Sequence, residues 1–174
     1  EDELRHMLCT ALQHDGPVAL RYPRGRGPGA AIAGPPRLLE WGKGQVLREG
    51  DDVALIAIGV GVQAALEAAE DLAGQGVQAT VVNARFIKPL DEELIAGLAA
   101  RCHKIVTVEE NVAAGGFGSA VLECLARRGL REVAVKVVAV GDVFVEHGSQ
   151  AELRALHGVD RAGVVGAALA LLAS

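Results

Sequence analysis

Aromatic residues are scarce in this sequence: Phe, Trp and Tyr together account for 3% of its 174 residues. The hydrophobic residues, 51% of the total, are therefore mainly Val, Ala, Leu and Ile. This composition, together with 22 glycines, is typical of buried parallel strands covered by alanine-rich helices. The length is enough for one good core with a piece of a second domain attached.

Cysteine is also scarce. Cys9, Cys102 and Cys124 lie far apart and match no metal-ligand spacing, so the pattern excludes a cysteine-based zinc site. An odd number of cysteines without a disulfide framework indicates free thiols in a reducing compartment. We therefore expect a cytoplasmic protein.

The chain lacks both a basic stripe and a long apolar run. Its 17 basic and 22 acidic residues are interspersed, with a net charge of −5, which argues against nucleic-acid binding. The longest apolar stretch, residues 162–173, is too short and too rich in alanine to span a bilayer. Neither nucleic acid nor a membrane is expected as a partner.

The first 27 residues are interpreted as the C-terminal end of a domain whose larger part lies elsewhere, since no initiator methionine precedes them. A helix is predicted there because five apolar residues share one helical face: Leu4, Met7, Leu8, Ala11 and Leu12. A strand is predicted at 18–20. Residues 28–41, rich in Gly and Pro, are expected to form a linker, and 42–174 a complete domain.

Strands and helices alternate through residues 42–174. Residues 41–48 and 53–58 are predicted to form a β-hairpin around a turn at 49–52. The elements expected after it are strands 78–82, 104–108 and 133–140, helices 62–73, 92–100 and 119–127, and two C-terminal helices. This alternation predicts an α/β fold with a mixed, mostly parallel sheet of about five strands, helices on both faces, and the hairpin strand as an antiparallel edge.

Three helix starts carry capping signals. Asp91 precedes the helix at 92, Ser149 with Glu152 has capping-box spacing, and Asp160 precedes the last helix.

Two arginines flank a proline in Arg21-Tyr22-Pro23-Arg24-Gly25, between the predicted strand and a glycine-rich loop. Strand ends that open into such loops are where open α/β folds bind ligands. The guanidinium fork suits a phosphate or a carboxylate. An arginine pair that forms salt bridges across a domain edge explains the same residues equally well, so both interpretations stay open.

The segment Gly59-Val-Gly61-Val-Gln-Ala64 resembles a dinucleotide-binding fingerprint of the G-x-G-x-x-A type. The acidic residue expected at the end of the next strand is absent, since Val82-Asn83-Ala84-Arg85 stands there. We interpret the glycines as a tight turn from strand to helix.

Glu109 and Glu110 end a strand ahead of the glycines Gly115-Gly-Phe-Gly118. A helix start can cradle an anion, and paired carboxylates can act as acid and base. Neighbouring strand residues point to opposite faces, however, so an edge loop that contacts a neighbouring domain or subunit is the favoured interpretation. His147 has Asp142 nearby but no nucleophile, and it forms no triad. No role is assigned to His147, Glu109 or Glu110.

A family resemblance covers essentially the whole chain in order. Six segments carry the resemblance: residues 15–25, Gly42-Lys-Gly44, 82–91, 106–111, Gly115-Gly-Phe-Gly118 and 144–148. These segments resemble the 1-deoxy-D-xylulose-5-phosphate synthases, which are transketolase-like, thiamine-diphosphate-dependent enzymes. Segments 85–91 and 108–111, together with the glycine loop at 115–118, are specific for the transketolase-like C-terminal domain. Tyr22-Pro23-Arg24-Gly25 also occurs in related dehydrogenase β-subunits.

The resemblance implies a transferase that condenses pyruvate with D-glyceraldehyde 3-phosphate. CO₂ is lost, and 1-deoxy-D-xylulose 5-phosphate is formed for isoprenoid, thiamine and pyridoxal biosynthesis. Thiamine diphosphate and Mg²⁺ would be bound by regions outside these 174 residues, so the fragment alone would be inactive, with no catalytic, cofactor or metal residue. The implied partners are the N-terminal remainder of the same protein and a second copy in a homodimer.

Arg24 is the residue to which the resemblance gives a role, as the ligand for the phosphate of the acceptor substrate. Arg21 is a second candidate for contact with the same phosphate. Two alternatives remain: the C-terminal domain of a 2-oxo acid dehydrogenase β-subunit, and a non-catalytic dimerisation module. Phosphate specificity separates the synthase from the dehydrogenase, because a lipoyl acceptor needs no phosphate site.

Overall fold

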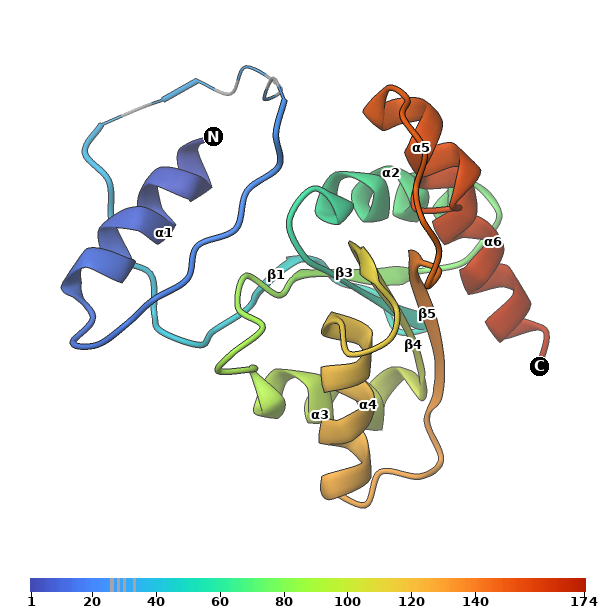
Figure 1. Cartoon of the computed structure of the whole chain (residues 1–174). Helices are drawn as coiled ribbons and strands as arrows, with labels where there is room; N and C mark the ends of the chain where they lie inside the picture. The colour runs from blue at the N-terminus through green and yellow to red at the C-terminus, as the bar shows by residue number, and fades with distance from the viewer. Residues whose placement is uncertain (26, 28, 30, 33) are drawn as a thin grey trace.

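A computed structural model of the chain describes residues 1–25, 27, 29, 31–32 and 34–174. Its five-stranded sheet has the order β1-β3-β2-β4-β5 (Figure 1). The strands are β1 (Gln45–Arg48), β2 (Val53–Ala57), β3 (Ala79–Asn83), β4 (Lys104–Val112) and β5 (Ala134–Val140). β2 to β5 run parallel, and β1 is antiparallel to β3, which confirms the predicted mixed, mostly parallel sheet.

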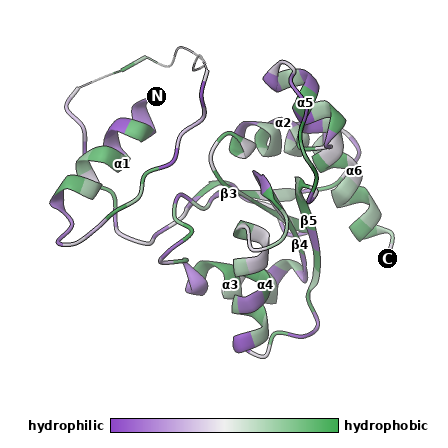
Figure 2. Ribbon diagram, in the orientation of Figure 1, coloured by the Kyte–Doolittle hydropathy of each residue, from purple (hydrophilic) through white to green (hydrophobic). Residues whose placement is uncertain are grey.

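Helices cover both faces of the sheet. They are α2 (Gly61–Gly74), α3 (Glu92–Cys102), α4 (Phe117–Arg127) and α6 (Arg161–Leu172). Side chains of β2 alternate between a core shared with α2 and α6 and a core shared with α3 and α4. Every residue of β2 is buried, as expected for a central parallel strand. Figure 2 shows hydrophobic residues along the strands and along α6. The five strands, these four helices and α5 (Gln150–Leu156) are together called the sheet unit below.

The predicted hairpin is wrong. β1 pairs with β3, and β2 lies on the other side of β3, so these two consecutive strands are not neighbours. The loop between them crosses the start of β3: the Gly50 N–H donates to Thr80 Oγ1 at 3.0 Å, and Asp52 exchanges two hydrogen bonds with Gln78. The wholly apolar β2 gains buried neighbours on both edges in this order, whereas the half-exposed β1 suits the sheet edge.

The N-terminal helix forms as α1 (Asp2–Gln13), but the predicted strand at 18–20 does not form. A strand is stable only when its backbone groups pair with a neighbouring strand. The segment pairs with none of the five strands of the sheet. The apolar run therefore stays without regular structure in this chain.

The three predicted helix caps are confirmed. Asp91 accepts a hydrogen bond from Leu94 N–H, Ser149 and Glu152 form a capping box on α5 (Gln150–Leu156), and Asp160 accepts from Gly163 N–H. By length and composition alone, Gln150–Leu172 would be sufficient to cross a membrane. In the structure this stretch is two helices, and α6 packs against α2 and β5.

The three free cysteines differ in accessibility. Cys102 and Cys124 are buried, and burial raises the pKa of both thiols, while Cys9 is half-buried. We expect a thiol reagent at neutral pH to modify Cys9 first and the other two only after unfolding, because the thiolate is the reactive form. Intact-mass analysis over time measures this order. Rapid labelling of Cys102 or Cys124 in the folded protein would contradict the described core.

Candidate functional site

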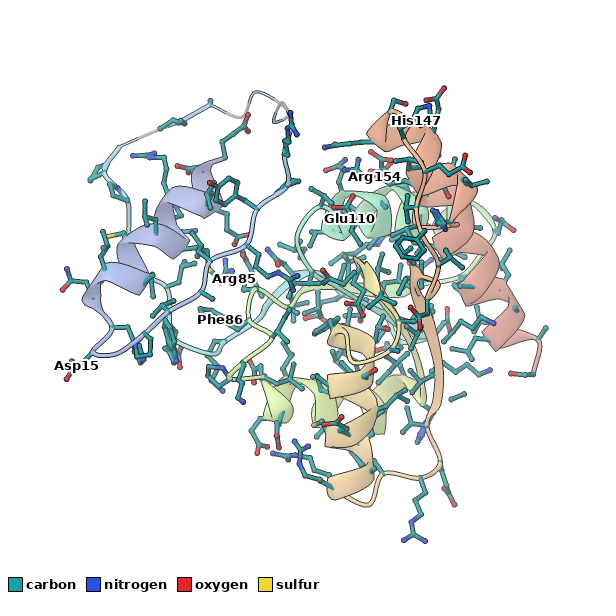
Figure 3. The ribbon with its side chains drawn as sticks, in the orientation of Figure 1. Asp15, Arg85, Phe86, Glu110, His147 and Arg154 are labelled. Atoms are coloured by element: carbon teal, nitrogen blue, oxygen red, sulfur yellow. The ribbon has the colours of Figure 1, made fainter. Side chains whose placement is uncertain are left out.

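α1 and His14, the residue that follows it, contact the segment before β1 and the loop after β3. The ring of His14 stacks on Trp41, with centroids 4.0 Å apart, and Trp41 tilts against Phe86. Glu3 forms an ion pair with Arg85, Nε to Oε1, at 2.7 Å. Figure 3 shows Arg85 and Phe86 on the side of the sheet unit that faces α1. These contacts fix where the chain leaves α1.

Arg85 reaches Glu3 from an unusual backbone conformation, with φ of 57°. The Asn83 side chain supports it, since Asn83 Oδ1 accepts the Arg85 N–H at 3.1 Å while the Asn83 amide donates to Glu3. Asn tolerates and supports such local turns through its side chain. Asn83 and Arg85, which lie in the segment 82–91 that carries part of the family resemblance, therefore anchor α1.

Arg21 and Arg24, the two predicted phosphate-binding residues, are both exposed. Within the described part of the chain, neither guanidinium makes a hydrogen bond or an ion pair. Seven other arginines do form ion pairs: Arg5, Arg85, Arg101, Arg127, Arg128, Arg154 and Arg161. The alternative of salt bridges across a domain edge is not realised among the described residues, and both positive charges are open to an anion.

The backbone of Arg24 lies beside the first turn of α5. The side-chain amide of Gln150 donates a hydrogen bond to the Arg24 carbonyl. The approach is close: a Cβ on Gly25 would come within 2.7 Å of Gln150 Nε2. A residue 126 positions away thus holds the predicted phosphate-binding segment.

Glu109 is completely buried, and its carboxylate caps α4. Its two oxygens accept hydrogen bonds from Phe117 N–H at 2.8 Å, Gly118 N–H at 2.7 Å and the Asn111 amide at 3.2 Å. The anion at this helix start is therefore the chain's own carboxylate, stabilised by the helix dipole. The interpretation as an edge loop is wrong for Glu109, which has a structural role. A Cβ on Gly116 would lie 2.6 Å from Glu109 Oε2, which explains the glycine at that position.

Glu110 points away from Glu109, as the strand geometry predicted, and pairs with Arg154 at 2.5 Å. Figure 3 shows Glu110 and Arg154 together at the side of α5. The two glutamates therefore serve different elements. His147 is exposed in the loop before α5.

A cavity of about 340 Å³ lies where α2 begins, lined among others by Gly61, Glu110, Arg154 and Arg161. Ligands of open α/β sheets usually bind at such a place. Both arginines are already paired, Arg154 with Glu110 and Arg161 with Asp71, and the hydrogen bond from Arg161 holds the pKa of Asp71 below its usual range. This cavity therefore offers no unpaired arginine to a dinucleotide phosphate, which favours the tight-turn interpretation of the glycines.

The described residues contain no cluster of three or more His, Cys, Asp or Glu side chains that could hold a metal ion.

The sequence of this chain was compared with those of known families and proteins. The sequence profile of the transketolase C-terminal domain matches residues 42–164. A 1-deoxy-D-xylulose-5-phosphate synthase of Geobacter sulfurreducens is 56% identical over 174 residues, which is the whole chain and 27% of that protein. The synthase of Thermomicrobium roseum is 53% identical over 175 residues, covering the whole chain and 28% of that protein. The chain thus spans about a quarter of the length of these relatives.

A solved structure supports the same fold. It is described as a split-gene transketolase in an inactive beta4 tetramer, and it superposes with a TM-score of 0.75 at 38% sequence identity. The match covers 83% of this chain and 46% of that one.

Proposed function

This chain belongs to the transketolase C-terminal domain family, and we propose that it forms the C-terminal part of a 1-deoxy-D-xylulose-5-phosphate synthase. The observation that carries the proposal is the 56% identity with a synthase over all 174 residues. This identity includes residues 1–41, which lie outside the matched domain profile and contain Arg24.

The complete enzyme would condense pyruvate and D-glyceraldehyde 3-phosphate with loss of CO₂. Thiamine diphosphate and Mg²⁺ would be held by regions outside this chain. Among the described residues, no three His, Cys, Asp or Glu side chains are grouped so that they could hold a metal ion. In this proposal residues 1–27 end a pyrimidine-binding domain, 28–41 are a linker and 42–174 are the C-terminal domain. The enzyme would act as a cytoplasmic homodimer.

The contribution of this chain's own residues is recognition of the acceptor. The guanidinium of Arg24, exposed and without a partner among the described residues, would bind the phosphate of D-glyceraldehyde 3-phosphate. A permanently charged fork of donors matches a dianionic phosphate. Arg21, three positions earlier, would add charge near the same group.

The proposal is tested by assaying the complete enzyme with pyruvate and two acceptors. We expect 1-deoxy-D-xylulose 5-phosphate by mass spectrometry, lost when thiamine diphosphate or Mg²⁺ is withdrawn. The kcat/KM for unphosphorylated D-glyceraldehyde should be roughly ten- to a hundredfold lower, because one charge-assisted hydrogen bond to the phosphate is missing. Residues 1–174 alone serve as the inactive control. Transfer of an acetyl group to a lipoyl acceptor instead would contradict the synthase and favour the dehydrogenase β-subunit.

A further inference from the structure

We infer that Glu110, Arg154 and Gln150 form a polar chain that positions Arg24 for the acceptor phosphate. The inference rests on the proposed role of Arg24 and adds residues to which the family resemblance gives no part. It starts from a hydrogen-bonded path between the end of a core strand and the backbone of the phosphate-binding segment.

The path has three links. The Arg154 Nε lies 2.5 Å from Glu110 Oε1 at the end of β4. The Arg154 Nη2 donates to Gln150 Oε1 at 3.1 Å, and Gln150 Nε2 donates to the carbonyl of Arg24. The direction of each hydrogen bond agrees with the chemistry of the groups, because a guanidinium can only donate and a carboxylate can only accept. The path thus leads from the rigid sheet to a segment without regular structure.

Arg154 fixes the orientation of the Gln150 amide. A glutamine amide presents an acceptor on one side and a donor on the other, and the two can exchange by rotation of the group. Because Arg154 can only donate, it selects the Gln150 oxygen and turns the NH₂ toward Arg24. Glu110 in turn holds the Arg154 guanidinium. Loss of Arg154 would release the amide even though Gln150 itself is intact.

Gln150 matters because Arg24 has little else to hold it. Residues 17–25 contain no helix or strand. Within the part of the chain that the structure describes, no other hydrogen bond joins them to the sheet unit. Misplacing a group that contacts the substrate by about 1 Å can lower catalytic efficiency by up to a hundredfold, so one anchoring bond can have a measurable effect.

Gly25 provides the space for this contact. Its φ is not in the left-handed region, so alanine is tolerated by the backbone, but a Cβ would press on the Gln150 amide at 2.7 Å. The amide is the far end of a flexible side chain and would move away. Gly25→Ala therefore disturbs the contact from the side of the phosphate-binding segment without removing either partner.

The test uses steady-state kinetics of the complete enzyme, varying each substrate. Gln150→Ala, Gln150→Glu, Arg154→Met and Gly25→Ala should each raise the KM for D-glyceraldehyde 3-phosphate about three- to tenfold, the effect of one hydrogen bond. The KM for pyruvate and kcat at saturating substrates should stay near the parent values. Gln150→Glu is the sharpest variant, because it keeps size and the Arg154 contact but lacks the donor. Gln75→Ala, at an exposed glutamine that ends α2, is the matched control and should leave both KM values and kcat unchanged.

Arg24→Ala separates this inference from the function it rests on. In that background Gln150→Ala should have no further effect, since the positioned group is gone. If Arg24→Ala loses acceptor affinity while the Gln150 and Arg154 variants match the parent, the polar chain is overturned and the phosphate site stands. If Arg24→Ala keeps parental kinetics, both are overturned. Equal losses for pyruvate and acceptor would show a general structural role and overturn the positioning role.

Discussion

Replacing Glu109 with alanine is expected to lower the free energy of unfolding by about 3–5 kcal/mol. The change leaves two buried N–H groups, of Phe117 and Gly118, without their acceptor, and each unsatisfied group costs about 1–3 kcal/mol. It also removes the negative charge that the start of α4 stabilises. Glu109→Gln should cost less, since one oxygen remains to accept a hydrogen bond, but its NH₂ group would face a backbone N–H.

Urea denaturation followed by circular dichroism measures this effect. Glu110→Gln is the control, because Glu110 is the neighbouring residue on β4 but its ion pair with Arg154 is exposed to solvent. Exposed ion pairs contribute little to stability, so the control should unfold at nearly the parental urea concentration. Similar losses in Glu109→Ala and Glu110→Gln would contradict the described cap of α4.

Arg24→Ala is expected to lower kcat/KM for D-glyceraldehyde 3-phosphate roughly ten- to a hundredfold in the complete enzyme. The reason is the loss of a charge-assisted contact with the phosphate. The KM for pyruvate should be largely unaffected, because pyruvate carries no phosphate. Arg24→Lys should recover only part of the loss, since a point charge cannot reproduce the paired donors of the guanidinium.

Steady-state kinetics with each substrate varied in turn, together with a thermal unfolding curve, check this result. Arg21→Ala should have a smaller effect in the same direction. Arg131→Ala, an exposed arginine in the loop before β5, should have none. A lowered unfolding temperature with equal losses for both substrates would show that Arg24 is structural.

The alternation of strands and helices predicts the mostly parallel sheet, and the capping residues Asp91, Ser149 and Asp160 predict three helix starts. The antiparallel edge strand is also found, but it does not belong to the hairpin from which it was predicted. The neighbour of β1 could not be predicted in the same way. The turn at 49–52 signals a reversal of the chain, but pairing is decided by which order buries β2 on both edges. That preference depends on β3 and β4, which come 26 and 51 residues after the start of β2 in the sequence.

The sequence predicted only part of the role of Glu109. Strand geometry separated it correctly from Glu110, but the pattern did not show that it is buried. A signal was available: a carboxylate eight residues before Phe117, with glycines at 116 and 118, suits a helix cap that needs close backbone approach. Gln150 had no such signal, because its contact with Arg24 joins segments that only the fold brings together.

The most direct measurement is a crystal structure of the complete enzyme with D-glyceraldehyde 3-phosphate bound. A phosphate oxygen should lie about 2.7–2.9 Å from a nitrogen of the Arg24 guanidinium, the usual length of a charge-assisted hydrogen bond. The Gln150 amide should still donate to the Arg24 carbonyl in that complex. A phosphate held by other residues, with the Arg24 guanidinium turned away from it, would contradict the proposed role of this chain.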